Sequence, residues 1–83
     1  MITVTLYGTP ACRRYQWMRE LALNASKKIS IPIELKEIGD TESLSRINPL
    51  SLPRMYIDVD LVASQNPPKP QVVEAALEKT YTH

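Results

Sequence analysis

The chain opens with alternating apolar and polar positions from Ile2 to Tyr7. The period of two and the β-branched side chains in this stretch predict a β-strand. Gly8 then ends the strand. Pro10 suits the first position of a helix, because its missing N–H is not needed there and its φ is already fixed near the helical value. A helix is therefore predicted to begin near Pro10 or Ala11.

Apolar residues next recur at spacings of three and four, which is the period of one helix face. They are Ala11, Tyr15, Met18, Ala22 and Ala25. This stripe predicts an amphipathic helix of about four turns that packs on the sheet. A second alternating stretch, residues 31–36, predicts another strand. Pro32 places that strand at an edge, because proline cannot donate a hydrogen bond to a neighbouring strand.

The second half of the chain begins and ends with predicted helices. Asp40 or Thr41 can cap a short helix, which is expected to stop at Asn48-Pro49. A proline-rich stretch ends at Pro70, and apolar positions after it recur at helical spacing. The last helix is therefore predicted to start near Pro70, at the position where proline is well tolerated.

Two short strands are predicted between those helices. Residues 54–58 and 61–63 are rich in strand-forming side chains, and a tight turn at Val59-Asp60 would join them as a hairpin. The resulting order, β-α-β-α-β-β-α, predicts one α/β domain over residues 1–83. Its first two strands would be parallel and the hairpin antiparallel, which gives a four-stranded mixed sheet with helices on both faces.

Composition narrows the classes of function. The formal net charge is +1, so no sequence-wide field attracts nucleic acid or an anionic membrane. A single cysteine excludes an internal disulfide and a multi-cysteine zinc site, and it is typical of a reducing compartment. No signal peptide is recognised, and no apolar stretch approaches the ~20 residues that span a bilayer. We therefore expect a cytoplasmic protein with no metal, no resident cofactor, and no nucleic-acid or membrane partner.

Cys12 is the one side chain placed for chemistry. In the first turn of the predicted helix, unpaired N–H groups and the positive end of the helix dipole favour a thiolate, and Arg13 and Arg14 follow directly. The alternative is a small buried apolar residue, as unpaired cysteines often are. Arg14 has two interpretations, a stem that covers the sheet edge or an anion-binding group. Trp17 lies off the apolar stripe and also has two interpretations, a contact site on the surface or a rim residue that packs on a neighbouring loop.

The segment Leu6–Tyr15 resembles the strand, loop and helix start of glutaredoxins and of small thioredoxin-like "redox-active disulfide" proteins, in which a CxxC motif opens the first helix. The resemblance implies that Cys12 is the attacking cysteine and that Tyr15 occupies the place of the resolving cysteine. Ser51-Leu52-Pro53 resembles the loop of these proteins that ends in a cis-proline beside the active cysteine. The order of elements matches along nearly the whole chain and implies a thioredoxin-like fold.

The resemblance also implies a function, a one-cysteine thiol-disulfide oxidoreductase with Cys12 as the nucleophile. Protein or peptide thiols and disulfides would be its partners, and glutathione is a candidate co-substrate. The substrate-binding residues would be Pro10, Arg13, Arg14, Tyr15, Leu52 and Pro53.

Two departures from the pattern keep a second interpretation open. With Tyr15 in place of a second cysteine, the chain cannot close its own disulfide. Glutaredoxins usually carry a glycine pair and an acidic residue after the fourth strand, whereas residues 63–68 read Ala-Ser-Gln-Asn-Pro-Pro, which leaves glutathione binding open. The alternative function is a non-catalytic binding or scaffold module that has lost the resolving cysteine, so the sequence does not decide whether the protein is an enzyme.

Overall fold

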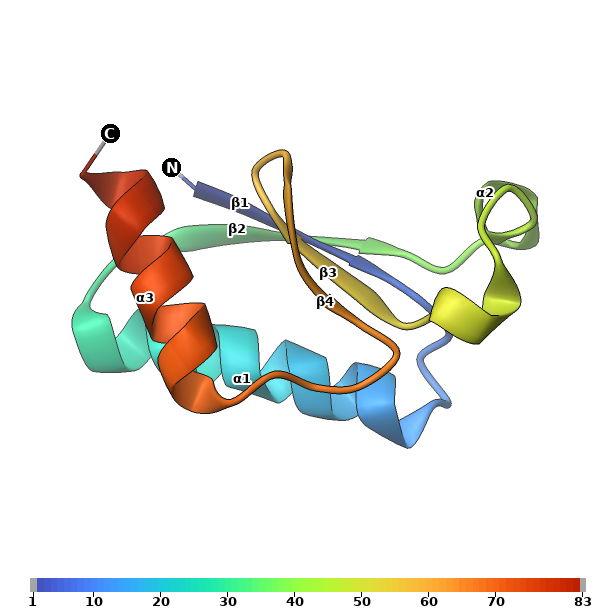
Figure 1. Ribbon diagram of the computed structural model, residues 1–83, viewed down its shortest axis with the longest axis horizontal. Coiled ribbons are helices and arrows are strands. Elements are labelled where there is room, and N and C mark those ends of the chain that lie inside the picture. Colours follow the sequence, from blue (N-terminus) through green and yellow to red (C-terminus); the bar gives the residue numbers. More distant parts are fainter. Residues whose placement is uncertain (1, 83) are drawn as a thin grey trace.

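The computed structural model describes residues 2–82 and contains the predicted order of helices and strands (Figure 1). The elements are β1 (Ile2–Tyr7), α1 (Arg13–Ile29), β2 (Ile33–Ile38), α2 (Thr41–Leu44), the 3₁₀ turn η1 (Pro49–Ser51), β3 (Arg54–Ile57), β4 (Asp60–Ser64) and α3 (Pro70–Tyr81). The last helix has Pro70 in its first turn, as predicted.

The four strands form one mixed sheet in the order β2-β1-β3-β4. β1 pairs in parallel with β2, and β3 pairs antiparallel with both β1 and β4. β2 lies at an edge, as predicted, but it spans Ile33–Ile38 and not residues 31–36, so Pro32 precedes the strand. The predicted four-stranded mixed sheet is therefore confirmed.

The core lies between one face of the sheet and the helices α1 and α3. Alternate residues of β1 are buried, and they share one apolar cluster with side chains of both helices. The cluster comprises Ile2, Val4, Leu6, Tyr15, Met18, Ala22, Ala25, Ile31, Met55, Ile57, Ala63, Val73 and Leu77. Of the described helices, only α2 and η1 lie toward the opposite face, at the end of the sheet away from α3 (Figure 1). The helical cover of the two faces is therefore very unequal.

Helix α1 begins later than the sequence predicts, at Arg13 rather than near Pro10 or Ala11. The preceding residues form a turn in which the backbone N–H of Cys12 donates to the carbonyl of Thr9 at 3.0 Å. Pro10 is the second residue of that turn, a position for which its fixed φ is equally suitable. The proline therefore marks a turn before the helix and not the helix start.

Two further boundaries differ from the predictions. The hairpin turn consists of Asp58 and Val59, because Ile57 pairs with Asp60 across it. Asp58 adopts φ +53°, a left-handed conformation that aspartate tolerates better than most residues. The second helix is capped by the Asp40 side chain, as predicted, but it is one turn long and ends well before Asn48.

Candidate functional site

Cys12 is the N-cap of α1. Its backbone is extended, and its carbonyl accepts the first helical hydrogen bond from the N–H of Gln16 at 3.0 Å. The thiol makes no capping hydrogen bond, and the residue is half-buried against the core. An N-cap side chain lies beside the free N–H groups of the first turn. Cys12 thus stays at the positive end of a 17-residue helix, with features of both interpretations drawn from the sequence.

Tyr15, at the place of a resolving cysteine, belongs to the core. Only 2% of the residue is exposed. Its hydroxyl donates to Oε1 of Glu37 at 2.8 Å, and Nε of Arg19 reaches the same oxygen at 3.1 Å. Burial, followed by the hydrogen bond to Glu37, raises the pKa of Tyr15 above its ordinary value. The sequence predicts Tyr15 as a substrate-binding residue. Its burial instead makes it a core residue whose ring packs against Gly8.

Gly8 brings Tyr15 and Pro53 together beneath the start of α1. A Cβ at residue 8 would lie 2.8 Å from Cδ2 of Tyr15 and 3.2 Å from Cβ of Pro53, and Gly8 has φ +156°. Pro53 is buried, Leu52 is half-buried, and the peptide bond between them is cis. The absence of a side chain at Gly8 is what allows the proline loop to reach the base of the helix.

The loop before β3 is tied to the end of β4 and the residue after it by three hydrogen bonds. The Ser64 hydroxyl donates to the carbonyl of Ser51 at 2.9 Å, and the N–H of Gln65 donates to the carbonyl of Pro53 at 3.0 Å. The Gln65 side-chain amide donates to the carbonyl of Leu50. Sequence reasoning gave Ser64 and Gln65 no such role. The available signal was a pair of polar residues at the end of a strand.

The remaining predicted site residues lie on the surface around Cys12. Pro10 is exposed, and its carbonyl accepts a hydrogen bond from Nε2 of Gln16 at 2.7 Å. Arg13 and Arg14 are also exposed and form no ion pair within residues 2–82. Both arginines instead line a hollow beside Trp17. The structure therefore separates the predicted site into an exposed rim, which includes the arginines, and a buried base at Tyr15 and Pro53.

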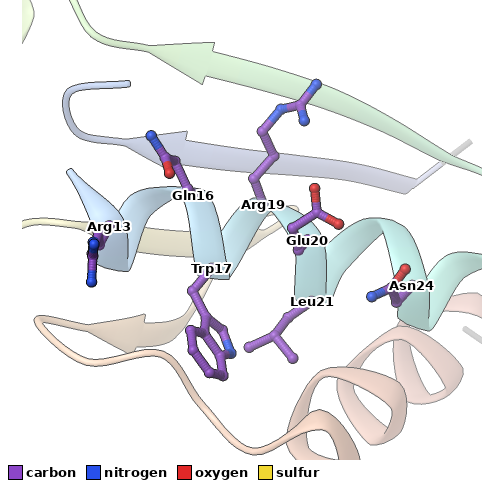
Figure 2. Close-up of a pocket in the computed structure, with 7 residues that line it drawn as sticks. All are labelled: Arg13, Gln16, Trp17, Arg19, Glu20, Leu21 and Asn24. Atoms are coloured by element: carbon purple, nitrogen blue, oxygen red, sulfur yellow. The ribbon is translucent and has the colours of Figure 1, made fainter. Parts of the chain in front are cut away.

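Figure 2 shows side chains along α1 from Arg13 to Asn24. Trp17 and Leu21 extend toward the loop between β4 and α3, whereas Arg19 extends toward β2. Trp17 is 64% exposed although it borders that loop. The two sequence interpretations of Trp17, a surface contact and a rim residue beside a loop, are therefore compatible.

We expect Tyr15→Phe to lower the free energy of unfolding by about 1–2 kcal/mol at neutral pH, because it removes a buried donor to a carboxylate and keeps the ring. Because the pKa of Tyr15 is raised in the native state, the phenol keeps its proton there at pH values at which the unfolded chain releases it. The contribution of Tyr15 is therefore complete below pH ~10 and declines above it by up to ~1.4 kcal/mol per pH unit.

Urea unfolding at several pH values, followed by circular dichroism, would measure both effects. The other three tyrosines are common to the wild type and the variant, so the difference between the two proteins isolates residue 15. A difference that stays constant from neutral pH to pH ~11 would contradict the assigned hydrogen bond.

Two searches within residues 2–82 were negative. No described helix has the length and apolarity needed to cross a membrane. No group of three or more His, Cys, Asp or Glu side chains in the same residues is arranged to hold a metal ion.

The four-stranded mixed sheet, the cysteine at the start of α1 and the proline loop at its base define a thioredoxin/glutaredoxin-like fold. Two solved structures agree with this assignment. Thioredoxin-2, described as a component of malaria parasite protein secretion machinery, superposes with a TM-score of 0.63 at 18% identity, over 95% of this chain and 82% of that one. Glutaredoxin 1 from Francisella tularensis, complexed with cacodylate, gives 0.52 at 17% identity over the whole of both chains. No protein-family model and no curated protein matches the sequence.

Proposed function

We propose that this protein is a one-cysteine thiol-disulfide oxidoreductase that acts on protein or glutathione mixed disulfides through Cys12. The observation that carries the proposal is the Cys12 thiol at the N-cap of α1, free of capping hydrogen bonds, in a thioredoxin/glutaredoxin-like fold. N–H groups at a helix start stabilise the thiolate, which is the nucleophile in disulfide exchange. Pro53, at the base of the helix, would shape the floor on which a substrate rests.

The reaction consists of two exchanges. The Cys12 thiolate attacks the glutathione sulfur of a protein–glutathione disulfide, so that a Cys12–glutathione disulfide forms and the protein leaves as a thiolate that takes up a proton. A second, external glutathione thiolate then attacks the glutathione sulfur on Cys12. Oxidised glutathione is released, and the Cys12 thiolate is regenerated. The net change converts one protein–glutathione disulfide and one glutathione thiol into one protein thiol and one oxidised glutathione.

Intact-mass spectrometry after exposure to oxidised glutathione tests the first covalent step. We expect one glutathione adduct per chain, removed by excess reduced glutathione, and reduction of a peptide–glutathione disulfide with reduced glutathione as the reductant. The rate of Cys12 alkylation should be measured as a function of pH in the same preparation. No adduct, no turnover, and alkylation only after unfolding would reject the oxidoreductase.

A second candidate function is a thioredoxin-fold binding module without a redox cycle. The position of Tyr15 favours it, because the place of a resolving thiol is filled by a core ring bonded to Glu37. The partial packing of Cys12 against the core points the same way. If the protein is a binding module, Cys12→Ser should keep every binding activity. If it is an oxidoreductase, the same variant should lose turnover.

A further inference from the structure

A second surface begins at Arg13 and extends away from Cys12 along α1. It is a groove between this helix and segment 67–70, which comprises the end of the loop from β4 and the first residue of α3. The helix contributes Arg13, Arg14, Trp17 and Leu21. Segment 67–70 contributes three prolines and Lys69. The groove therefore joins two parts of the chain that are far apart in sequence, and it shares Arg13 and Arg14 with the rim of the site proposed above.

The groove has an apolar floor that is open to solvent. Trp17 is 64% exposed, and it is the single tryptophan of the chain. Figure 2 shows its indole ring and Leu21 on the side of α1 that faces the loop. An exposed tryptophan beside prolines resembles the anchor positions of protein interfaces, where aromatic groups contribute much of the binding energy. Prolines lose little conformational freedom when a ligand orders them.

The charged residues that line this groove are of one sign, and Glu20 lies in the adjoining hollow that shares Arg13, Trp17 and Leu21 with it. The three ionisable residues that line the groove, Arg13, Arg14 and Lys69, are all cations. Within residues 2–82 the ion pairs are Arg19–Glu37 and Lys28–Glu74, so none of the three groove cations is paired there. The whole chain carries only +1, so this is a local concentration of positive charge. A complementary ligand carries carboxylates at its edges and an apolar group at its centre.

We propose that this groove binds an acidic segment of a partner protein, in which apolar side chains are flanked by aspartate or glutamate. The apolar side chains would pack on Trp17 and Leu21, and the carboxylates would pair with the groove cations. Because Arg13 directly follows Cys12, the bound segment would run past the thiol. The binding itself does not depend on Cys12 chemistry. A nucleic acid fits less well, since one aromatic ring and three cations offer little stacking or phosphate contact.

The single tryptophan makes the test direct. The probe is the peptide acetyl-Asp-Glu-Leu-Phe-Glu-Asp-amide, titrated into the Cys12→Ser protein so that no redox step interferes. We expect saturable binding by isothermal titration calorimetry, together with a change in Trp17 fluorescence. Raising the salt from about 0.05 M to about 0.5 M should weaken the binding, because the cations are exposed.

Three variants locate the binding. Arg13→Glu and Lys69→Glu should each lower the affinity for the peptide at least about five-fold, since each replaces an attraction with a repulsion. Lys27→Glu makes the same charge change on an exposed residue of the last turn of α1, away from the groove, and should leave the affinity within about two-fold. Circular dichroism would establish that all three variants are folded.

Four results would overturn the proposal. The first is equal binding of a peptide with lysine in place of its acidic residues, or with serine in place of leucine and phenylalanine. The second is equal affinity of the groove variants and the Lys27 control, or no saturable binding. The third is tighter binding of oligothymidine, which would assign the groove to nucleic acid. The fourth is a dimer in gel filtration that Trp17→Ala dissociates, which would make a second copy the occupant. Because Cys12 is already serine, failure of the redox proposal would affect none of these results.

Discussion

Replacement of Cys12 with serine is expected to lower the rate at which a peptide–glutathione disulfide is reduced by more than about a hundred-fold, to the uncatalysed rate. A serine hydroxyl cannot form the mixed disulfide, and no other cysteine exists in the chain to take over the attack. The measurement is the initial rate of release of oxidised glutathione, at fixed concentrations of the peptide disulfide and reduced glutathione. Mass spectrometry should show no adduct on the variant.

Ala11→Ser provides a matched control, because it introduces a hydroxyl at an exposed neighbouring position and leaves the sulfur intact. Its turnover should stay within about two-fold of the wild-type rate. A Cys12→Ser protein that retained turnover would contradict the assignment of the nucleophile. If both variants and the wild type were inactive but still bound a partner, the binding module would be the better description.

Replacement of Gly8 with alanine is expected to lower the free energy of unfolding by about 2–4 kcal/mol. The added Cβ would lie 2.8 Å from the buried ring of Tyr15 and 3.2 Å from Pro53, at a φ that alanine disfavours. Neither neighbour is the free end of a flexible side chain, so relief requires movement of the helix start or the proline loop. For a domain of this size the melting temperature should fall by roughly 10–25 °C.

Thermal unfolding by circular dichroism would test this, with Thr9→Ala as the control. Thr9 is the exposed neighbour of Gly8, so its truncation should change stability by no more than ~0.5 kcal/mol. Equal melting temperatures for Gly8→Ala and the wild type would show that Tyr15 and Pro53 are not packed as described. Urea unfolding would give the free energies independently of the melting scan.

The sequence was sufficient for those parts of the fold that depend on local periodicity. The alternation from Ile2 to Leu6 places β1, and the stripe predicted from Ala11 to Ala25 gives the buried face of α1 except at Ala11, which is exposed before the helix starts. The edge position predicted from Pro32 is also correct for β2, although the proline precedes the strand. In each case a single rule, either the period of the side chains or a missing N–H, acts on adjacent residues and has no competitor.

The start of α1 could not be fixed in this way. Pro10 is as favourable in the second position of a turn as in the first position of a helix, and the deciding hydrogen bond runs from Cys12 to Thr9. The turn of the hairpin was predicted one residue too late for a similar reason, since aspartate can occupy either half of a tight turn. Local rules of equal strength leave such boundaries open until tertiary contacts select one.

The sequence predicted the position of Cys12 at the helix start and the proline loop at Pro53, but not the contacts of Tyr15. The bond between Tyr15 and Glu37 exists because β2 lies beside β1, which brings residues 22 positions apart into contact. The groove beside Trp17 depends on the path of segment 67–70 across α1. Both features follow from the assembled sheet and helices rather than from any short motif.

The burial of Tyr15 limits what can replace it. A two-thiol motif would need more than one substitution, because a cysteine at residue 15 would leave a void where the ring now packs against Gly8. Losing a buried aromatic ring costs about 3–5 kcal/mol, a large share of the stability of a small domain. It would also leave Glu37 without its phenol donor. A second sulfur at residue 15 would thus require compensating substitutions in the surrounding core.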